Sequence, residues 1–397
     1  VALDNYHALL DFFNKFPKYK DSQLFLTGES YGGVYIPMLS VLVVEGYNKK
    51  EFPVKLSGFA VGNGMLSFKE QANSAVNLLY YRGAIGFHKW TEINDVCCNG
   101  TKLQCDYYSH LKVKSRHAGD YESDGTQCGD LAVYLVQNLT EASKNDYYNQ
   151  YQDCYSGQLS SATEYGIQYP KIVYPKTDPR VPDLARLINY DSTDNLWGFP
   201  CWNNASASLL YMNRPDVKEA IHAKLDIKWS DCNLDLNMNY YQITHMDVYK
   251  EFEKVIAESD ARILVYNGDV DSACNFLGDQ WFVHNLIEKV GNIKVVKERK
   301  PWLYRNQIAG YVKRYDRIDQ MTVKGSGHFV PMDRPGPSLQ MISNFFENSM
   351  DYNQPVSYDL QLQPIRENGA DTRRITIYSI FVASLLATMA SGFNMSY

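Results

Sequence analysis

The segment 24–37, which reads LFLTGESYGGVYIP, constrains the fold of this 397-residue chain more than any other. Its apolar run at 24–27 is typical of a β-strand, and the pattern G-x-S-x-G follows at once. This spacing is typical of a strand that turns sharply into a helix, because glycines tolerate the crowding on either side of the serine. We therefore predict an α/β fold in which Ser30 lies exposed above a sheet as a nucleophile.

A serine hydroxyl reacts only with a general base beside it and a carboxylate that orients the base. After a turn of this kind, the carboxylate and then the histidine follow later in the chain. The strand-like run 263–266 ends at an Asn-Gly turn signal, which Asp269 and Asp271 follow. The run 321–323 precedes Gly-Ser-Gly and His328. The chain thus offers His328 as the base and either aspartate as its partner.

The chain closely resembles serine carboxypeptidases, the family of lysosomal cathepsin A, in three blocks: GESYGGVYIP at 28–37, GDVDSACNF at 268–276 and GSGHFVPMDRP at 325–335. The resemblance also covers VGNG at 61–64, after the next strand-like run. It extends from about residue 1 to about residue 350.

The resemblance implies an α/β-hydrolase fold with a disulfide-rich cap insertion and a catalytic triad of Ser30, Asp271 and His328. The family pattern D-x-x-C-N begins at Asp271, so we expect Asp269 to be a structural turn residue. In such a triad the serine attacks a carbonyl carbon, the histidine transfers the proton and an acyl-enzyme forms. The backbone N–H of Tyr31 is expected to be one oxyanion donor.

Glu29 stands beside the candidate nucleophile, where a carboxylate would repel an anionic substrate. If apolar surroundings keep it protonated, it can instead donate a hydrogen bond to the free C-terminal carboxylate of a peptide. The alternative is that Glu29 is merely the variable residue of the motif, but the resemblance favours the functional interpretation and implies activity at acidic pH.

We therefore predict a serine-type carboxypeptidase that hydrolyses C-terminal residues from peptides at acidic pH and needs no cofactor or metal. One alternative is an esterase or acyltransferase on the same scaffold, because these activities share the triad. Another is a non-catalytic stabilising partner of lysosomal proteins.

The chain departs from the family pattern at its start, which is Val1 rather than Met. The family segment W-x-N-G-G-P-G-C-S-S, which supplies a second oxyanion N–H and an Asn for the substrate carboxylate, is not found. We therefore expect that the N-terminal strands of the fold are missing. We favour a fragment of a longer precursor over a divergent and inactive product.

Six of the eight cysteines lie between residues 97 and 201. Zinc is the alternative use of such a cluster, but the spacings lack paired C-x2-C knuckles and nearby histidines in register, which favours disulfides. By resemblance, the pairs are Cys97–Cys128, Cys98–Cys105 and Cys154–Cys201. The resemblance also places the partner of Cys232 in the absent segment and makes Cys274 a buried free thiol.

Sequons for N-glycosylation begin at Asn99, Asn138, Asn204 and Asn394. Together with the disulfides, the first three indicate an oxidising compartment, so we expect a protein of the secretory pathway, either lysosomal or extracellular. The net charge is −6 and no basic patch interleaves with aromatic residues, which argues against nucleic acid as a partner. A peptide with a free C-terminal carboxylate is the expected partner, and a homodimer is compatible with the family.

The chain is expected to comprise a first part of the α/β-hydrolase core with the elbow, a cap insertion, a second part of the core with the aspartate and histidine, and a tail, at 1–67, 68–201, 202–352 and 353–397 respectively. The cap contains a loop at 169–180 that is either a proteolytic activation site or an ordinary loop. In the tail, the stretch 375–393 is long enough to span a bilayer, but two arginines precede it on the side that opposes the positive-inside tendency. Membrane attachment through this tail is left open.

Overall fold

The computed structural model describes residues 1–98, 105–113, 121–138, 146, 148–151, 211–230, 244–349 and 351–356. Several sequence predictions lie outside the described residues: Asn99, Asn204, Cys154, Cys201, Cys232, Asn394, the loop 169–180, the apolar tail and the side chain of Asn138. The chain divides into two compact units, one of Val1–Ala142, Tyr147–Tyr151 and Ile243–Val356, and one of Ser143–Asp146, Gln152–Gln242 and Ser357–Tyr397. The domain boundaries expected from the sequence stay predictions.

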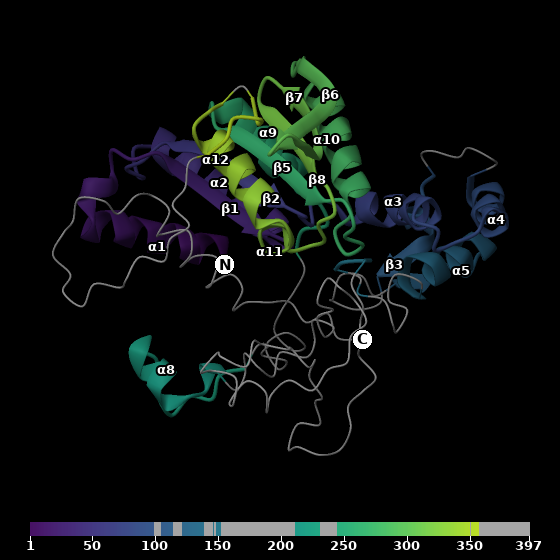
Figure 1. Ribbon diagram of the computed structural model, residues 1–397, viewed down its shortest axis with the longest axis horizontal. Coiled ribbons are helices and arrows are strands. Elements are labelled where there is room, and N and C mark those ends of the chain that lie inside the picture. The colour runs from purple at the N-terminus through teal and green to yellow at the C-terminus, as the bar shows by residue number, and fades with distance from the viewer. Residues whose placement is uncertain are drawn as a thin grey trace. The chain divides into compact units, whose positions relative to one another are not determined.

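The first unit is built on a six-stranded sheet with the strand order β1-β2-β5-β8-β7-β6 (Figure 1). The four strands from β1 to β8 are parallel, and β7 and β6 continue the sheet in antiparallel fashion. In sheet order, the strands are β1 (Leu24–Glu29), β2 (Leu56–Gly62), β5 (Arg262–Gly268), β8 (Ile318–Val323), β7 (Gln307–Tyr315) and β6 (Val295–Tyr304). The carboxyl ends of β1, β2, β5 and β8 therefore meet at one edge of the sheet, where open α/β sheets place their chemistry.

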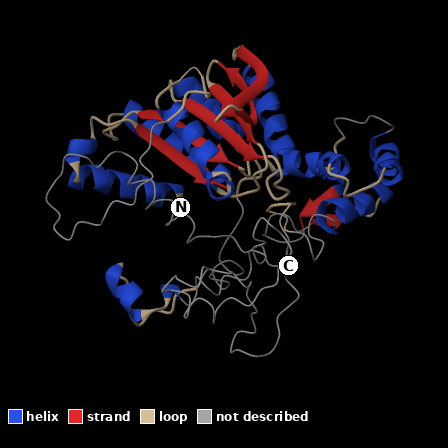
Figure 2. Ribbon diagram, in the orientation of Figure 1, coloured by secondary structure: helices blue, strands red, loops and turns tan. Residues whose placement is uncertain are grey.

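Helices lie against both faces of this sheet (Figure 2). One face is covered by α2, α9 and α10, and the other by α12. The helices of this layer arrangement are α1 (Ala2–Lys15), α2 (Gly32–Asn48), α9 (Tyr249–Glu258), α10 (Phe276–Val290), α11 (Val330–Asp333) and α12 (Pro335–Phe346), with a short 3-10 turn η1 (Pro17–Tyr19) after α1. Parallel strands covered in this way read as continuous apolar runs, as the sequence of β2 and β5 does.

Successive residues of the central strands pack on opposite faces of the sheet. Phe59 of β2 packs against Phe252 of α9, with ring centroids 5.1 Å apart. Its neighbour Ala60 belongs to the core cluster on the opposite face, together with Met341 and Phe345 of α12. Because both faces are buried, the register of each strand is fixed, and the loops after β1, β2, β5 and β8 are held in defined positions.

A helical segment within the same unit follows β2. It comprises α3 (Phe68–Tyr81), α4 (Phe87–Cys98), η2 (Tyr108–His110), the hairpin of β3 (Leu111–Val113) and β4 (Tyr121–Ser123), α5 (Gln127–Val133) and the π-helix η3 (Tyr134–Asn138). It has a core of its own, in which Ile93, Tyr107 and Leu135 are completely or almost completely buried. Two disulfides staple it, Cys97–Cys128 and Cys98–Cys105, which are the pairings that the resemblance implied.

The described part of the second unit is limited to Asp146 and residues 211–230, which include α8 (Pro215–Ala220). Within the part of the chain that the structure describes, no helix combines the length and the apolar character needed to cross a bilayer.

Candidate active site

Ser30 occupies the tight turn between β1 and α2. Its φ of +62° lies in the left-handed region, which non-glycine residues rarely adopt. The turn is possible only because its glycines let other atoms come close. A Cβ on Gly28 would lie 2.6 Å from Cγ1 of Ile36, and a Cβ on Gly33 would lie 2.6 Å from the backbone nitrogen of Met65. The sequence pattern therefore predicts the local geometry correctly, and the strained serine stands at the carboxyl end of β1.

Tyr31 follows as the N-cap residue of α2, so its backbone N–H lies at the positive end of the helix. The turn is anchored to the neighbouring strand as well. The N–H of Ser30 donates to the carbonyl of Gly62 over 3.1 Å, and the N–H of Met65 donates to the carbonyl of Ser30 over 2.9 Å. The loop after β2 thus holds the candidate nucleophile in place from the side.

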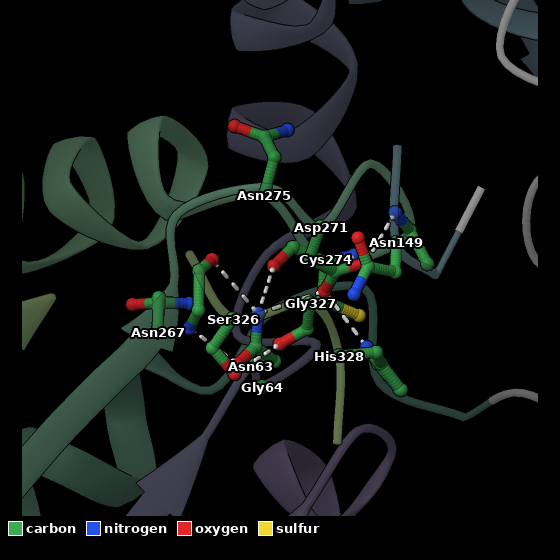
Figure 3. A network of polar contacts seen from close by, with 12 residues as sticks. Asn63, Gly64, Asn149, Asn267, Asp271, Cys274, Asn275, Ser326, Gly327 and His328 are labelled. Atoms are coloured by element: carbon green, nitrogen blue, oxygen red, sulfur yellow. Dashed lines mark hydrogen bonds and ion pairs between the residues drawn. The ribbon is translucent and has the colours of Figure 1, made fainter. Parts of the chain in front are cut away.

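His328 and Asp271 form a buried pair at the same edge of the sheet (Figure 3). Nδ1 of His328 lies 2.7 Å from Oδ2 of Asp271, and the two side chains are 1% and 0% exposed. The carboxylate also accepts hydrogen bonds from the backbone N–H groups of Ala273, at 2.8 Å, and Cys274, at 3.1 Å. Because a carboxylate only accepts, this contact keeps the imidazole proton on Nδ1 and leaves Nε2 as the basic atom.

A fourth donor to Asp271 is Asn63, whose Nδ2 lies 2.8 Å from Oδ2 of the aspartate. No role for Asn63 could be assigned from the sequence, although it stands within one of the blocks that carry the resemblance. The sequence feature that could have identified Asn63 is the pattern Gly-Asn-Gly at the end of a buried strand. Asn is among the few residues that tolerate a left-handed backbone.

The loop that carries His328 is held by residues 148–151, for which the sequence offered no signal. The N–H of His328 donates to the carbonyl of Tyr148 over 2.7 Å, and the two rings lie 4.6 Å apart. Asn149 donates to Oδ2 of Asp333 over 3.1 Å, and the same oxygen accepts from the N–H of Gly327 over 2.7 Å. Segments far apart in the sequence therefore fix the backbone on both sides of the histidine.

Glu29, the last residue of β1, is half-buried beside this pair. Burial raises the pKa of its carboxyl group from 4.5 to about 7. The positive charge that His328 can carry opposes the rise, whereas the carboxylates of Asp271 and Asp333 add to it. At acidic pH the group is therefore a neutral hydrogen-bond donor.

Two further acids near the site have structural contacts. Oδ1 of Asp269 accepts from the N–H of Gly325 over 2.7 Å, so this side chain ties the loop after β5 to the loop after β8. Asp279 in α10 is completely buried, and desolvation raises its pKa to about 8. Among the described cysteines, Cys274 alone stands outside a disulfide, and burial raises the pKa of its thiol.

The model of the serine carboxypeptidase family matches residues 1–348 of this chain. The chain belongs to the serine carboxypeptidase family. A serine carboxypeptidase of Caenorhabditis elegans, ctsa-3.1, is 36% identical over 387 residues, which cover 87% of this chain and 67% of the relative. The lysosomal protective protein of Mus musculus is 34% identical over 369 residues, which cover 87% of this chain and 69% of the relative.

Among solved structures, the prohormone-processing carboxypeptidase Kex1Δp from Saccharomyces cerevisiae matches with a TM-score of 0.56 at 18% identity, covering 86% of this chain and 65% of that chain. This likeness shows the fold alone. The predicted membership of the serine carboxypeptidases and the predicted α/β-hydrolase fold are confirmed. The chain spans about two thirds of the length of the relatives it matches.

Proposed function

We propose that this serine carboxypeptidase hydrolyses the C-terminal residue of peptides at acidic pH through a triad of Ser30, His328 and Asp271. The observation that carries the proposal is the buried 2.7 Å contact between His328 and Asp271. It lies at the edge of the sheet where the left-handed turn presents Ser30. The three residues follow three parallel strands of one sheet, and the ends of these strands are held side by side by its hydrogen-bond ladder.

The reaction follows from the positions of the protons. With its proton on Nδ1, His328 accepts the Ser30 proton at Nε2 as the hydroxyl oxygen bonds to the carbonyl carbon of the scissile peptide bond. Asp271 stabilises the imidazolium that forms. The imidazolium then protonates the leaving amine as the C–N bond breaks, and water hydrolyses the acyl-enzyme by the same steps in reverse. The N–H of Tyr31 stabilises the oxyanion.

Glu29 is the group that would recognise the free end of the substrate. Because its pKa is about 7, it is protonated at acidic pH and can donate a hydrogen bond to a C-terminal carboxylate. At higher pH the same group ionises and repels that carboxylate. This switch supports an exopeptidase that works in acid.

The location we propose is the secretory pathway, with a lysosomal or extracellular destination. Two disulfides staple the helical segment, and disulfides persist in oxidising compartments. The mouse relative carries the name lysosomal protective protein, which agrees with this location.

The proposal is tested with three substrates at about pH 5: an N-acylated Phe-Leu dipeptide, its C-terminal amide, and an N-acylated Phe ester. A carboxypeptidase releases leucine from the dipeptide with a free C-terminus and cleaves the C-terminal amide much more slowly. Only the free dipeptide carries the C-terminal carboxylate that Glu29 is proposed to bind. Ester cleavage without leucine release would assign the chain to the esterases or acyltransferases. A folded protein that cleaves none of the three substrates would support a non-catalytic stabilising role.

A further inference from the structure

Asn63 lies in the loop after β2 and is 0% exposed. Its side chain uses both of its polar ends. Nδ2 donates to Oδ2 of Asp271 at 2.8 Å and lies 3.3 Å from the carbonyl oxygen of Cys274 and 3.4 Å from that of Gly268. Oδ1 accepts from the N–H of Gly268 at 2.8 Å. This amide therefore connects the ends of β2 and β5 and contacts the Asp271 carboxylate (Figure 3).

The backbone around Asn63 is tied to the nucleophile turn. Asn63 itself has a left-handed φ of +40°, and its N–H donates to the carbonyl of Tyr266 over 2.9 Å. Its neighbours Gly62 and Met65 hold the N–H and the carbonyl of Ser30 by hydrogen bonds. The turn of residues 62–65 thus contacts both the candidate nucleophile, Ser30, and the carboxylate of Asp271.

We propose that Asn63 is a positioning residue for the reaction, whose side chain fixes the Asp271 carboxylate against His328 from a turn whose other residues, Gly62 and Met65, hold the backbone of Ser30. The inference rests on the proposed function, because it assigns a role within that triad.

The physical basis is the geometry around one oxygen. Oδ2 of Asp271 faces both Nδ1 of His328 and Nδ2 of Asn63, so the amide restricts rotation of the carboxylate away from the imidazole. A hydrogen bond to a charged group is among the stronger ones, and a buried carboxylate that loses a donor is poorly solvated. Loss of this amide is expected to lower kcat about 10- to 100-fold. KM should stay unchanged, because the side chain faces the aspartate and the loop carbonyls.

Two variants separate the side chain from the backbone. Asn63→Gly removes the amide but tolerates the left-handed φ, and Asn63→Asp keeps the size and replaces the amide donor by a carboxyl group. The matched control is Asn94→Ala in α4. Asn94 is also 0% exposed, and it bonds to the carbonyl of Trp90 and the hydroxyl of Tyr107, so its loss costs stability outside the site.

The readout is the reaction of Ser30 in the full chain with a fluorophosphonate probe, and kcat and KM for an N-acyl amino-acid ester, from about pH 5 to 8. Neither compound has a free carboxylate, so the recognition role proposed for Glu29 drops out. Within the described residues, the ionisable groups that face this turn include Glu29 at the end of β1, Tyr266 in β5, Asp271 and Cys274 after β5, Asp279 in α10 and His328 after β8.

In wild type, the proton of Ser30 is accepted by the neutral form of the imidazole. A carboxyl group at position 63 lies against Asp271, and the like charge and burial raise its pKa. When protonated it donates to Asp271, and when ionised it repels that carboxylate. The rate of Asn63→Asp relative to wild type should therefore fall at least tenfold between pH 5 and 8. This ratio is measured within one folded variant, so it decides the question even if Asn63→Gly does not fold.

Rates of both Asn63 variants within twofold of wild type would overturn the inference, as would losses that Asn94→Ala reproduces with parallel pH profiles. If wild type itself fails to react at Ser30, the proposed triad is wrong and the inference falls with it. A reactive, Ser30-labelled wild type with indifferent Asn63 variants leaves the proposed function standing and rejects the positioning role alone.

Discussion

At the scale of single residues, the site depends on side chains whose charge is set by burial. The motif alone assigns no role to Glu29, because any residue can occupy the variable position of G-x-S-x-G. Half-buried beside the pair of Asp271 and His328, its carboxyl group has a pKa of about 7. The sequence supported this protonated state only through the family resemblance. The structure supplies the cause, which is the desolvation of the carboxylate at the end of β1.

Replacement of Glu29 by glutamine should remove the fall of peptidase activity in the neutral range. Wild-type kcat/KM for a peptide should drop as pH rises through about 7, because the ionised carboxylate repels the substrate. The drop should approach about tenfold for each further pH unit. A glutamine amide donates at every pH, so the profile of Glu29→Gln should stay flat to within about threefold between pH 6 and 8.

The measurement for Glu29→Gln is kcat/KM for an N-acylated dipeptide across this range, with an ester that lacks a free carboxylate as the control substrate. The ester profiles of the two proteins should coincide. An unchanged fall on the peptide in the variant would assign the pH dependence to another group.

At the scale of secondary-structure elements, the site is made by turns that follow parallel strands. The turn after β1 could be predicted because its constraint is local: a left-handed serine flanked by glycines. The turn after β2 could not, because Asn63 meets Asp271 across 208 positions of the chain. The amino-acid sequence does not show which two turns lie next to each other until the strand order is known. The contacts of residues 148–151 with the loop that carries His328 could not be predicted for the same reason.

Two adjacent glycines of α2 should respond differently to alanine. A Cβ on Gly33 would lie 2.6 Å from the Met65 nitrogen, and backbone cannot move aside easily. Gly33→Ala should therefore lower the free energy of unfolding by about 1–3 kcal/mol. A Cβ on Gly32 would have its nearest neighbour atom at 4.0 Å, so Gly32→Ala should leave stability unchanged or raise it by about 0.5–1 kcal/mol.

Denaturant unfolding of the two glycine variants beside wild type measures the difference. Equal stability of Gly32→Ala and Gly33→Ala would mean that the loop after β2 does not pack against α2 as described.

At the scale of the whole molecule, a buried acid makes the stability of the fold greater at acidic pH than at neutral pH. Asp279 accepts from Asn267 at 2.8 Å, Gln71 at 2.9 Å and the N–H of Gly64 at 3.3 Å, and desolvation still raises its pKa from 3.8 to about 8. The sequence alone could not identify this acid, since an Asp in the first turn of a helix is usually solvated. The overall fold and the family, by contrast, followed from the three sequence blocks.

Stability should fall as pH rises from about 4 to about 8. Asp279 binds its proton more tightly in the folded state than in the unfolded state, so its contribution is fully present below pH 3.8 and is lost as pH rises through about 8. Asp279→Asn should flatten this slope. It should also lower stability at pH 5 by about 1–3 kcal/mol, because the new amide hydrogens face existing donors.

The melting temperature of wild type and Asp279→Asn, measured at half-unit steps from pH 4.5 to 8.5, tests this dependence. The gap between the two proteins should narrow toward alkaline pH. Parallel curves would show that Asp279 does not titrate in this range.

The most direct test of the central claim is the release of leucine from an N-acylated Phe-Leu dipeptide by wild type and Ser30→Ala, from pH 4 to 8. We expect release by wild type that peaks in acid and declines through neutral pH, and a loss of at least about 1,000-fold in the serine variant at every pH. Leucine release that survives in folded Ser30→Ala would contradict the account, because the reaction would then proceed without the proposed nucleophile.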